Sequence, residues 1–224
     1  MKIVALIPIK TNNERIPGKN TKRFFDGTPL IHFIQKACLN AETISETYVY
    51  CSDEQIIEFV LPDVMFMKRP GFLDEDSANC NDIIREFIKC VESDIYIVSH
   101  ATAPFTKSKS IDACVDGIIS GGYDSGFLGR LYQKFLWKDG RAINFDVQKF
   151  PRTQDLPVMY EEAPGAYVFY KETFLKYDRR VGEKVYIHNI DDIESIDIDN
   201  PEDFEIANLI YKEIVSKNGI NSTS

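Results

Sequence analysis

The sequence predicts an α/β protein with three layers, in which helices cover both faces of a mostly parallel sheet. Apolar, strand-like runs alternate with amphipathic helical segments up to residue 122, and such alternation is typical of a parallel sheet. Residues 3–9 are apolar and rich in β-branched side chains, as expected of a strand buried on both faces. With 224 residues and 44% hydrophobic content, the chain suits one domain, or one domain with a small appendage.

The remaining elements follow from periodicity and from turn signals. Expected strands are residues 47–51, 64–67, 94–99, 124–131, 166–170, 184–190 and 193–198. Expected helices are residues 29–41, 52–60, 79–92, 107–120 and 200–216. The helix at 107–120 ends at a Gly-Gly pair, and the last helix starts with Asn200, Pro201 and two acidic residues, which is a typical helix start.

The regular alternation breaks after residue 131. Residues 132–164 form a predicted inserted arm, and residues 1–131 and 165–218 form the predicted α/β domain. The arm carries aromatic residues and a turn at residues 138–141 that suits a hairpin. Exposed aromatic residues outside the main sheet favour an oligomer contact, although the arm could instead fold back on its own core. The aromatic residues are Tyr132, Phe135, Trp137, Phe145 and Phe150.

Composition excludes several classes of protein. The net charge of −9 and pI near 4.9 argue against general binding of nucleic acid or anionic membranes. No apolar stretch is long enough to span a membrane, and the N-terminus reads as a strand rather than a signal peptide. Five widely spaced cysteines without a CxxC motif favour reduced thiols in a cytoplasmic protein. The three histidines have no metal-ligand spacing.

A basic loop follows the first strand. A cationic loop between a strand and a helix is where open α/β sheets bind phosphates, and Pro17-Gly18 allows the backbone to approach a ligand closely. On this stretch alone, a solvated loop is an equal alternative. Its basic residues are Lys10, Arg15, Lys19, Lys22 and Arg23, against Glu14 and Asp26. As a lysine in a polar loop, Lys19 is expected to contribute little to stability.

Residues 16–20, Ile-Pro-Gly-Lys-Asn, resemble the nucleotide-binding loop of the acylneuraminate cytidylyltransferase family. These enzymes make CMP-activated sialic acid and related 2-keto-3-deoxy sugar acids. Lys10 stands where the family has arginine, and residues 11–14 depart from the usual Gly-Gly-Ser-Lys. The resemblance implies a nucleotide-diphospho-sugar-transferase-like, Rossmann-like fold and a dimerisation arm. It also implies a nucleotide-binding set of Lys10, Arg15, Lys19, Asn20, Arg69 and Asn79.

Arg69 belongs to that set because Arg69-Pro70, with Leu73 beyond, resembles a family segment whose arginine contacts the nucleotide. The hydroxyl residue of that segment falls at Asn79 or Cys80. An alternative for Arg69 is an ordinary ion pair with a nearby acid.

Two further segments imply binding of the sugar acid. Residues 99–105 are similar to the family turn Gln-Pro-Thr-Ser-Pro, with His100 in place of glutamine, and Thr102 lies in the same turn. Residues 152–157 resemble Arg-Arg-Gln-Asp-Leu-Pro, with Thr153 in place of the second arginine. The implied substrate-binding residues are His100, Thr102, Arg152 and Gln154.

Residues 196–203 are close to the family signature Ile-Asp-Ile-Asp-Thr-Pro-Glu-Asp. On a strand, Asp197 and Asp199 would face the same side, and two carboxylates plus substrate phosphates suit Mg²⁺. Asp199 could instead only cap the last helix. The implied catalytic residues are Lys19, Asp199 and Lys10.

The resemblance therefore implies a homodimeric enzyme that transfers CMP from CTP to a 2-keto-3-deoxy sugar acid, with Mg²⁺ as cofactor and release of pyrophosphate. The alternatives are a CMP-KDO-type or phosphonate cytidylyltransferase, a metal-dependent glycosyltransferase, and a catalytically inactive nucleotide-binding assembly module. The Pro-Gly-Lys-Asn loop argues against the glycosyltransferase, and Lys19, Asp197 and Asp199 argue against the inactive module.

Overall fold

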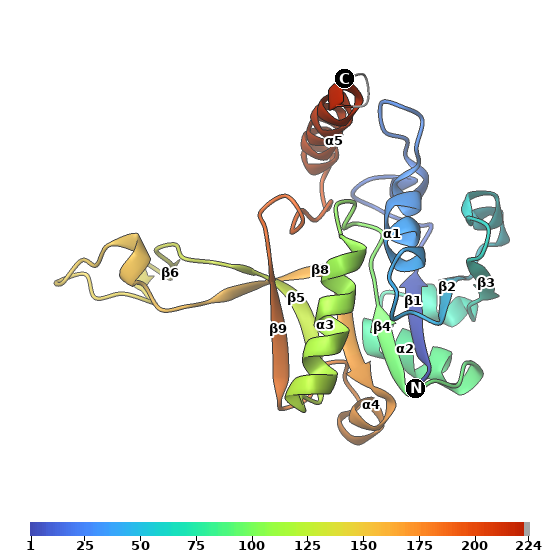
Figure 1. The fold of residues 1–224 in the computed structure, drawn as a ribbon, viewed down its shortest axis with the longest axis horizontal. Helices are drawn as coiled ribbons and strands as arrows, with labels where there is room; N and C mark the ends of the chain where they lie inside the picture. Colours follow the sequence, from blue (N-terminus) through green and yellow to red (C-terminus); the bar gives the residue numbers. More distant parts are fainter. Residues whose placement is uncertain (222–224) are drawn as a thin grey trace.

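One seven-stranded sheet organises the molecule, in the order β3-β2-β1-β4-β8-β5-β9 (Figure 1). The computed structural model describes residues 1–221, and the side chains of residues 1–215. The strands are β1 Ile3–Pro8, β2 Glu46–Cys51, β3 Met65–Lys68, β4 Ile95–Val98, β5 Ser125–Leu131, β6 Trp137–Lys138, β7 Arg141–Ala142, β8 Tyr160–Tyr170 and β9 Val185–Ile190. The α-helices are α1 Leu30–Leu39, α2 Cys80–Cys90, α3 Ser108–Gly121, α4 Lys171–Tyr177 and α5 Pro201–Asn221. The 3₁₀ helices are η1 Lys19–Thr21, η2 Glu54–Phe59, η3 Gly71–Asp74 and η4 Thr153–Asp155.

The sheet is mostly parallel, as the sequence predicts. β1 pairs in parallel with β2 and β4, β2 with β3, and β5 with β9. Only β8 runs antiparallel to its neighbours, β4 and β5. β8 starts at Tyr160 rather than at the expected residue 166, so the returning limb of the arm runs directly into the sheet.

Two apolar cores lie on opposite faces of the sheet and make the three layers. Ala5 and Ile7 of β1 join one core with residues of α1 and α3, whereas Val4 and Leu6 join the other with residues of α2 and α4. This alternation within β1 follows from the period of two in a strand. A strand buried on both faces is therefore apolar throughout, which confirms the interpretation of residues 3–9.

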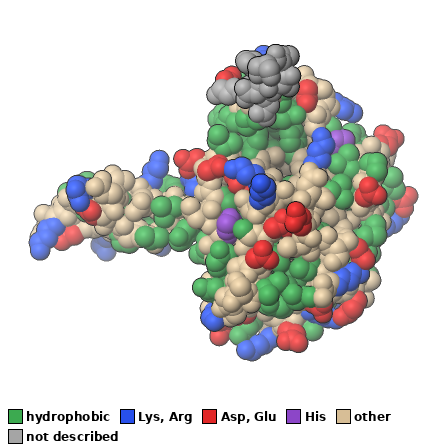
Figure 2. Space-filling model, in the orientation of Figure 1, with side chains coloured by type: hydrophobic (Ala, Val, Ile, Leu, Met, Phe, Trp, Pro, Cys, Tyr) green, Lys and Arg blue, Asp and Glu red, His purple; other side chains and the backbone are tan. Residues whose placement is uncertain are grey.

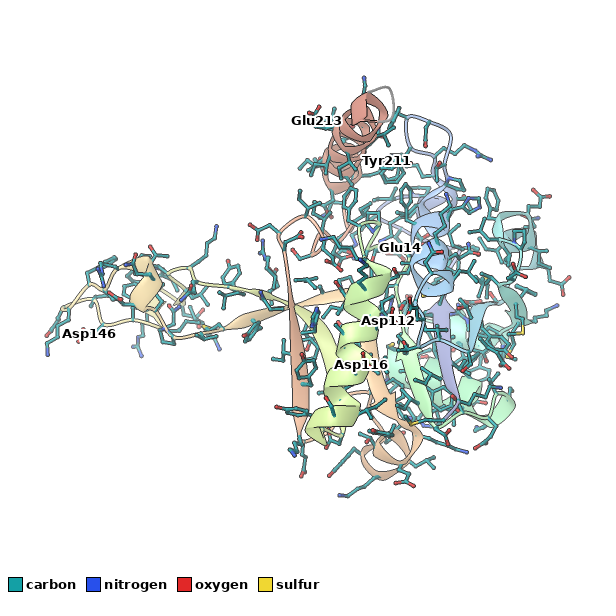
Figure 3. The ribbon with its side chains drawn as sticks, in the orientation of Figure 1. Glu14, Asp112, Asp116, Asp146, Tyr211 and Glu213 are labelled. Carbon is teal, nitrogen blue, oxygen red and sulfur yellow. The ribbon has the colours of Figure 1, made fainter. Side chains whose placement is uncertain are left out.

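A third core joins the basic loop to the C-terminal helix. Ile16, Phe24 and Leu30 pack with Ile198, Phe204 and Ala207. The Tyr211 hydroxyl, labelled on α5 in Figure 3, donates a hydrogen bond of 2.9 Å to the Asp26 carboxylate. These contacts hold the segment before α5 against the loop after β1.

Three details differ from the sequence-based expectation. Residues 193–198 form no strand, because the chain turns after β9: the main-chain N–H groups of Glu194 and Ser195 donate to Asp191 at 2.8 and 3.0 Å. The short helix α4 is not anticipated by the sequence pattern, since seven residues give too little periodicity. It ends at Asp178, which takes the left-handed conformation with φ 54°. α5 continues to Asn221, beyond the expected end near residue 216.

The arm projects away from the sheet (Figures 1 and 2). β6 and β7 form the predicted hairpin around Asp139 and Gly140, both at positive φ, as a tight hairpin turn requires. The Phe135 ring centroid lies 4.9 Å from that of Phe145 and 4.8 Å from that of Phe150. Phe150 is still 63% exposed, so this small cluster leaves apolar surface open. Within residues 1–221, no helix has the length and apolar character needed to cross a membrane.

Candidate active site

The predicted site residues before position 110 gather at one edge of the sheet. β1, β2, β3 and β4 run parallel, so their carboxyl ends share an edge, which is where open α/β sheets bind ligands. Lys10 follows β1, Arg69 follows β3 and His100 follows β4. Glu14, labelled in Figure 3, belongs to the loop that covers this edge.

Lys19 is directed inward by the turn before it. Gly18 has φ 66°, a left-handed conformation that glycine adopts readily, and η1 starts at the next residue. The Lys19 ammonium donates a hydrogen bond of 2.8 Å to the main-chain oxygen of Ile198 and lies 3.8 Å from the Asp199 carboxylate. Burial lowers the pKa of Lys19, an effect that the nearby Asp199 and Asp197 oppose. The lysine is buried, which argues against the alternative of a solvated loop.

The two aspartates of the signature lie near the same lysine, although they are not on a strand. The Asp199 carboxylate accepts a hydrogen bond of 2.9 Å from Arg15, and its own N–H donates to Asp203. It therefore does not serve as the cap of α5. Burial raises the pKa of Asp197, against a hydrogen bond from the Thr102 side chain, and the charge of Asp199 raises it further. The Thr102 carbonyl also accepts the Ile198 N–H at 2.9 Å.

This pair of carboxylates fits the expected metal in part. No group of three His, Cys, Asp or Glu side chains among the described residues could hold an ion by itself. Asp197 and Asp199 offer oxygen ligands, and two like charges close together favour an added cation. Mg²⁺ commonly takes one or two carboxylates and completes its shell with phosphate oxygens and water. The residues present thus fit a site that substrate phosphates complete.

Arg69 and Asn20 are both buried parts of the site. One Arg69 Nη donates to the Asp74 carboxylate, as the ion-pair alternative proposes. Its Nε, in contrast, has no hydrogen-bond partner within the described part of the chain, so a buried donor is left for another group. The Asn20 amide donates to the Lys10 main-chain oxygen at 2.8 Å and fixes the shape of the basic loop.

Asn79 has a structural role at the start of α2. Its side-chain oxygen accepts from the N–H groups of Asn81 and Asp82, and the Asp82 side chain accepts from the N–H of Asn79. This reciprocal capping box occupies the side-chain oxygen that the sequence assigns to the nucleotide. Asn79 still lies in the wall of the site beside Cys80.

His100 is held neutral. Its ring makes an edge contact with Tyr167, at 6.2 Å between centroids. Burial, together with the charges of Arg180 and Lys19, lowers the pKa of His100 to about 4. A neutral imidazole can donate and accept hydrogen bonds but is a weak base at neutral pH.

Arg180, in the loop between α4 and β9, also belongs to this group, and the sequence reasoning missed it. It reaches Cys80, where Nη1 lies 3.2 Å from Sγ, and its guanidinium lies 3.5 Å from the Tyr167 ring centroid. The only available sequence signal was a pair of arginines in a segment that the family motifs do not cover.

Three small cavities adjoin one another at this edge of the sheet, and together they are called the groove below. They share residues at their borders, namely Lys10 between the first two, and Asn79 and Cys80 between the second and third. The loop cavity, about 240 Å³, is lined by Lys10, Asn12, Asn13, Glu14, Arg15, Ile16, Lys19 and Asp76. The central cavity, about 200 Å³, is lined by Pro8, Lys10, Arg69, Leu73, Ala78, Asn79, Cys80, Ile83 and His100. The arginine cavity, about 270 Å³, is lined by Asn79, Cys80, Asn81, Arg179, Arg180 and Val181.

A larger cavity of about 460 Å³ lies beside Asn12 and Asn13 but has a different character. The described residues that line it include Asp53 and no lysine or arginine. It is therefore a poorer site for phosphates than the groove.

Arg152 and Gln154 are not brought into the groove. Both lie at η4, in the arm segment, and neither lines any of these cavities. The Arg152 guanidinium forms two hydrogen bonds, of 2.7 and 3.0 Å, with Asp155. Within one chain, these two predicted residues are thus separate from the other ten.

Comparison with known proteins identifies the family of the chain. The model of a protein family described as cytidylyltransferase matches residues 4–217. The chain is 25% identical to a pseudaminic acid cytidylyltransferase of Campylobacter jejuni, over 95% of this chain and 97% of that protein. It is 24% identical to the CMP-N,N′-diacetyllegionaminic acid synthase of Legionella pneumophila, with the same shares covered.

A longer relative and a solved structure are also similar to this chain. An N-acylneuraminate cytidylyltransferase of Streptococcus agalactiae is 23% identical, and the match spans 91% of this chain and 52% of that longer protein. Among solved structures, a CMP:2-keto-3-deoxy-manno-octonic acid synthetase complexed with CTP superposes with a TM-score of 0.72 at 16% identity, over 95% of this chain and 99% of that one. At this identity, the structural likeness shows the fold.

Proposed function

The chain belongs to the cytidylyltransferase family and is a nucleotidyltransferase, and we propose that it transfers CMP from CTP to a nonulosonic acid. The observation that carries this proposal is the meeting of Lys19 and Arg15 with Asp199 at the carboxyl edge of the sheet. Cations and carboxylates held together in a groove suit phosphoryl transfer, where catalysis consists mainly of positioning and charge stabilisation.

In the proposed reaction, the anomeric hydroxyl oxygen of the acid attacks the α-phosphorus of CTP. A new oxygen–phosphorus bond forms while the bond from phosphorus to the bridging oxygen of the β-phosphate breaks. Pyrophosphate leaves with that oxygen, and the hydroxyl proton passes to solvent. Lys19, Arg15 and Lys10 offset the negative charge of the triphosphate throughout this step.

Asp197 and Asp199 would hold a magnesium ion beside the same phosphates. When bound, the ion would supply Lewis-acid stabilisation of the phosphate charge. Without a cation, burial disfavours the charged form of Asp197, so the ionised pair is expected to depend on substrate and metal together.

The central cavity is the proposed site of the cytosine base. Arg69 lies in its wall, and the Nε of this arginine lacks a partner among the described side chains and main-chain groups. A base carbonyl oxygen would satisfy such a buried donor. The surrounding Leu73, Ala78 and Ile83 supply apolar contacts to a flat ring.

The proposed acceptor is a nonulosonic acid of the pseudaminic, legionaminic or sialic type. Relatives of matching length are named for the first two acids, whereas the sialic acid relative is about twice as long as the match. The inactive assembly module is disfavoured because Lys19, Asp197 and Asp199 form one cluster.

We further propose a homodimer formed through the arm, because Trp137 and Phe150 remain 56% and 63% exposed on a projection outside the sheet. The five cysteines of the described chain are free, and three of them are buried, which favours a reducing compartment such as the cytoplasm.

Product analysis tests the proposed function. Purified protein, CTP, Mg²⁺ and each of the three acids are incubated, and the products are separated and weighed by mass spectrometry. We expect a CMP adduct of at least one acid, absent when Mg²⁺ is chelated. Formation of no CMP adduct from any of the acids would contradict the proposal.

A further inference from the structure

The acceptor of the proposed reaction is an acid, and its carboxylate needs a cationic partner. Lys10, Arg15 and Lys19 lie at the loop cavity, where the triphosphate would need them. Thr153 replaces one arginine of the motif at residues 152–157, and Arg152 is paired with Asp155 on the arm. A cation for the acid is therefore to be sought elsewhere along the groove.

Arg180 lies at the far end of this groove and is only loosely paired. Its Nη2 is 4.0 Å from the Glu162 carboxylate, and Glu162 already accepts a hydrogen bond of 2.9 Å from the Tyr167 hydroxyl. The other contact, with Cys80 Sγ, involves a neutral group. By contrast, Arg85 makes two close hydrogen bonds to Asp178, at 2.9 and 2.7 Å. Arg180 thus retains bonding capacity for a further carboxylate.

The Arg180 side chain is also held in place before any ligand binds. It is 22% exposed, and its guanidinium lies over the Tyr167 ring. Tyr167 belongs to β8, in the centre of the sheet, so the guanidinium is supported by a rigid element. A cation fixed in this way loses little freedom when it binds an anion.

His100 lies next to Arg180, because both side chains contact the Tyr167 ring. The same histidine lines the central cavity, and the charge of Lys19 also acts on it. An acid bound at Arg180 would therefore approach Lys19 and the triphosphate along the His100 side of that cavity, with the cytosine base on the Arg69 side.

From this arrangement we propose that Arg180 binds the carboxylate of the acceptor sugar acid. The inference rests on the proposed function, because it assigns one residue to the acid substrate of that reaction. The guanidinium matches a carboxylate in two parallel hydrogen bonds, which fixes orientation as well as charge.

Steady-state kinetics of Arg180→Gln and Arg180→Lys test the assignment, with Lys176→Gln as the matched control. Lys176 is exposed on α4, where its ammonium donates a hydrogen bond of 2.7 Å to the Tyr177 hydroxyl, and it lines none of the three cavities. With the acid that wild type uses best, Arg180→Gln should raise the KM for the acid about tenfold or more, while the KM for CTP changes by less than about twofold. Arg180→Lys should recover part of the loss, and Lys176→Gln should resemble wild type.

The C1 methyl ester of the same acid provides a test that does not depend on the variant alone. Wild type should discriminate strongly against the ester, and Arg180→Gln should discriminate much less. Thermal melting of each variant checks that it is folded. An unchanged KM for the acid in folded Arg180→Gln, or undiminished discrimination against the ester, overturns the assignment while the proposed function stands. Absence of turnover by wild type with every acid overturns both.

Discussion

Lys19 and Ile198 are joined by a hydrogen bond of 2.8 Å from the lysine ammonium to the main-chain oxygen, across 179 residues of sequence. The bond ties the basic loop after β1 to the segment before α5. It therefore fixes the position of Asp199, the next residue, relative to the loop. One contact thus connects the stability of the site with its proposed chemistry.

Replacing Lys19 by methionine should lower both the stability of the protein and its turnover. The variant keeps the buried aliphatic stem but leaves the Ile198 carbonyl without its donor, so the free energy of unfolding should fall by about 1–3 kcal/mol. Loss of a charge contact to the reacting phosphates should lower turnover about a hundredfold or more. Urea unfolding and pyrophosphate release measure the two effects. The control is Lys22→Met, because Lys22 belongs to the same loop but is exposed. Equal turnover in the Lys19 and Lys22 variants would show that Lys19 has no part in the mechanism.

Replacing Asp199 by asparagine should separate folding from metal-dependent turnover. Its ion pair with Arg15 is partly exposed, and such pairs contribute at most about 1 kcal/mol, so the variant should fold normally. Loss of the negative charge should weaken a Mg²⁺ site that has only two carboxylates. Pyrophosphate release is measured against Mg²⁺ concentration in both proteins. If Asp199→Asn releases pyrophosphate at low Mg²⁺ concentration as fast as wild type does, Asp199 is not a metal ligand.

The sequence predicted the sheet and most of its helices because periodicity is a local property. It also placed Lys10, Lys19 and Arg69 at the correct edge, since parallel strands end together. The expectation of a strand at residues 193–198 was wrong, because alternating apolar and acidic residues here reflect packing of Ile198 in the third core rather than pairing with a strand.

Long-range contacts explain what sequence reasoning missed. Burial of Lys19 depends on Ile198, and the position of Arg180 depends on Tyr167 and Cys80. None of these contacts is visible from spacing.

Asn79 was assigned to the nucleotide by motif position, whereas its side-chain oxygen caps α2 through groups two and three residues away.

His100 should make stability depend on pH. Its pKa is 6.5 when unperturbed and about 4 in the folded chain, so between these values the unfolded chain binds more protons. The stability contributed by neutral His100 is therefore present above pH 6.5 and is lost as pH falls towards 4. The free energy of unfolding, measured in urea at pH 7 and at pH 5, should fall more for wild type than for His100→Gln. Other groups, including Asp197, titrate in both proteins and cancel in the comparison. Identical losses of unfolding free energy in the two proteins would contradict the lowered pKa of His100.

Removal of the arm should abolish association. Sedimentation at micromolar concentration should give a dimer for wild type and a monomer when residues 134–148 are replaced by a short turn. Phe150→Ser should weaken the dimer, because an exposed aromatic side chain is a typical interface anchor. Leu209→Ser, which removes a similarly exposed side chain from α5, should have no such effect. A monomeric wild type would contradict the proposed interface.

The most direct test of the central claim compares all four nucleoside triphosphates. Pyrophosphate release is measured with CTP, UTP, ATP or GTP, each with Mg²⁺ and with pseudaminic, legionaminic or N-acetylneuraminic acid, or with no acid. We expect release with CTP alone, and only when one of the acids is present. Equal release with every triphosphate, or release with CTP that does not depend on any acid, would contradict it.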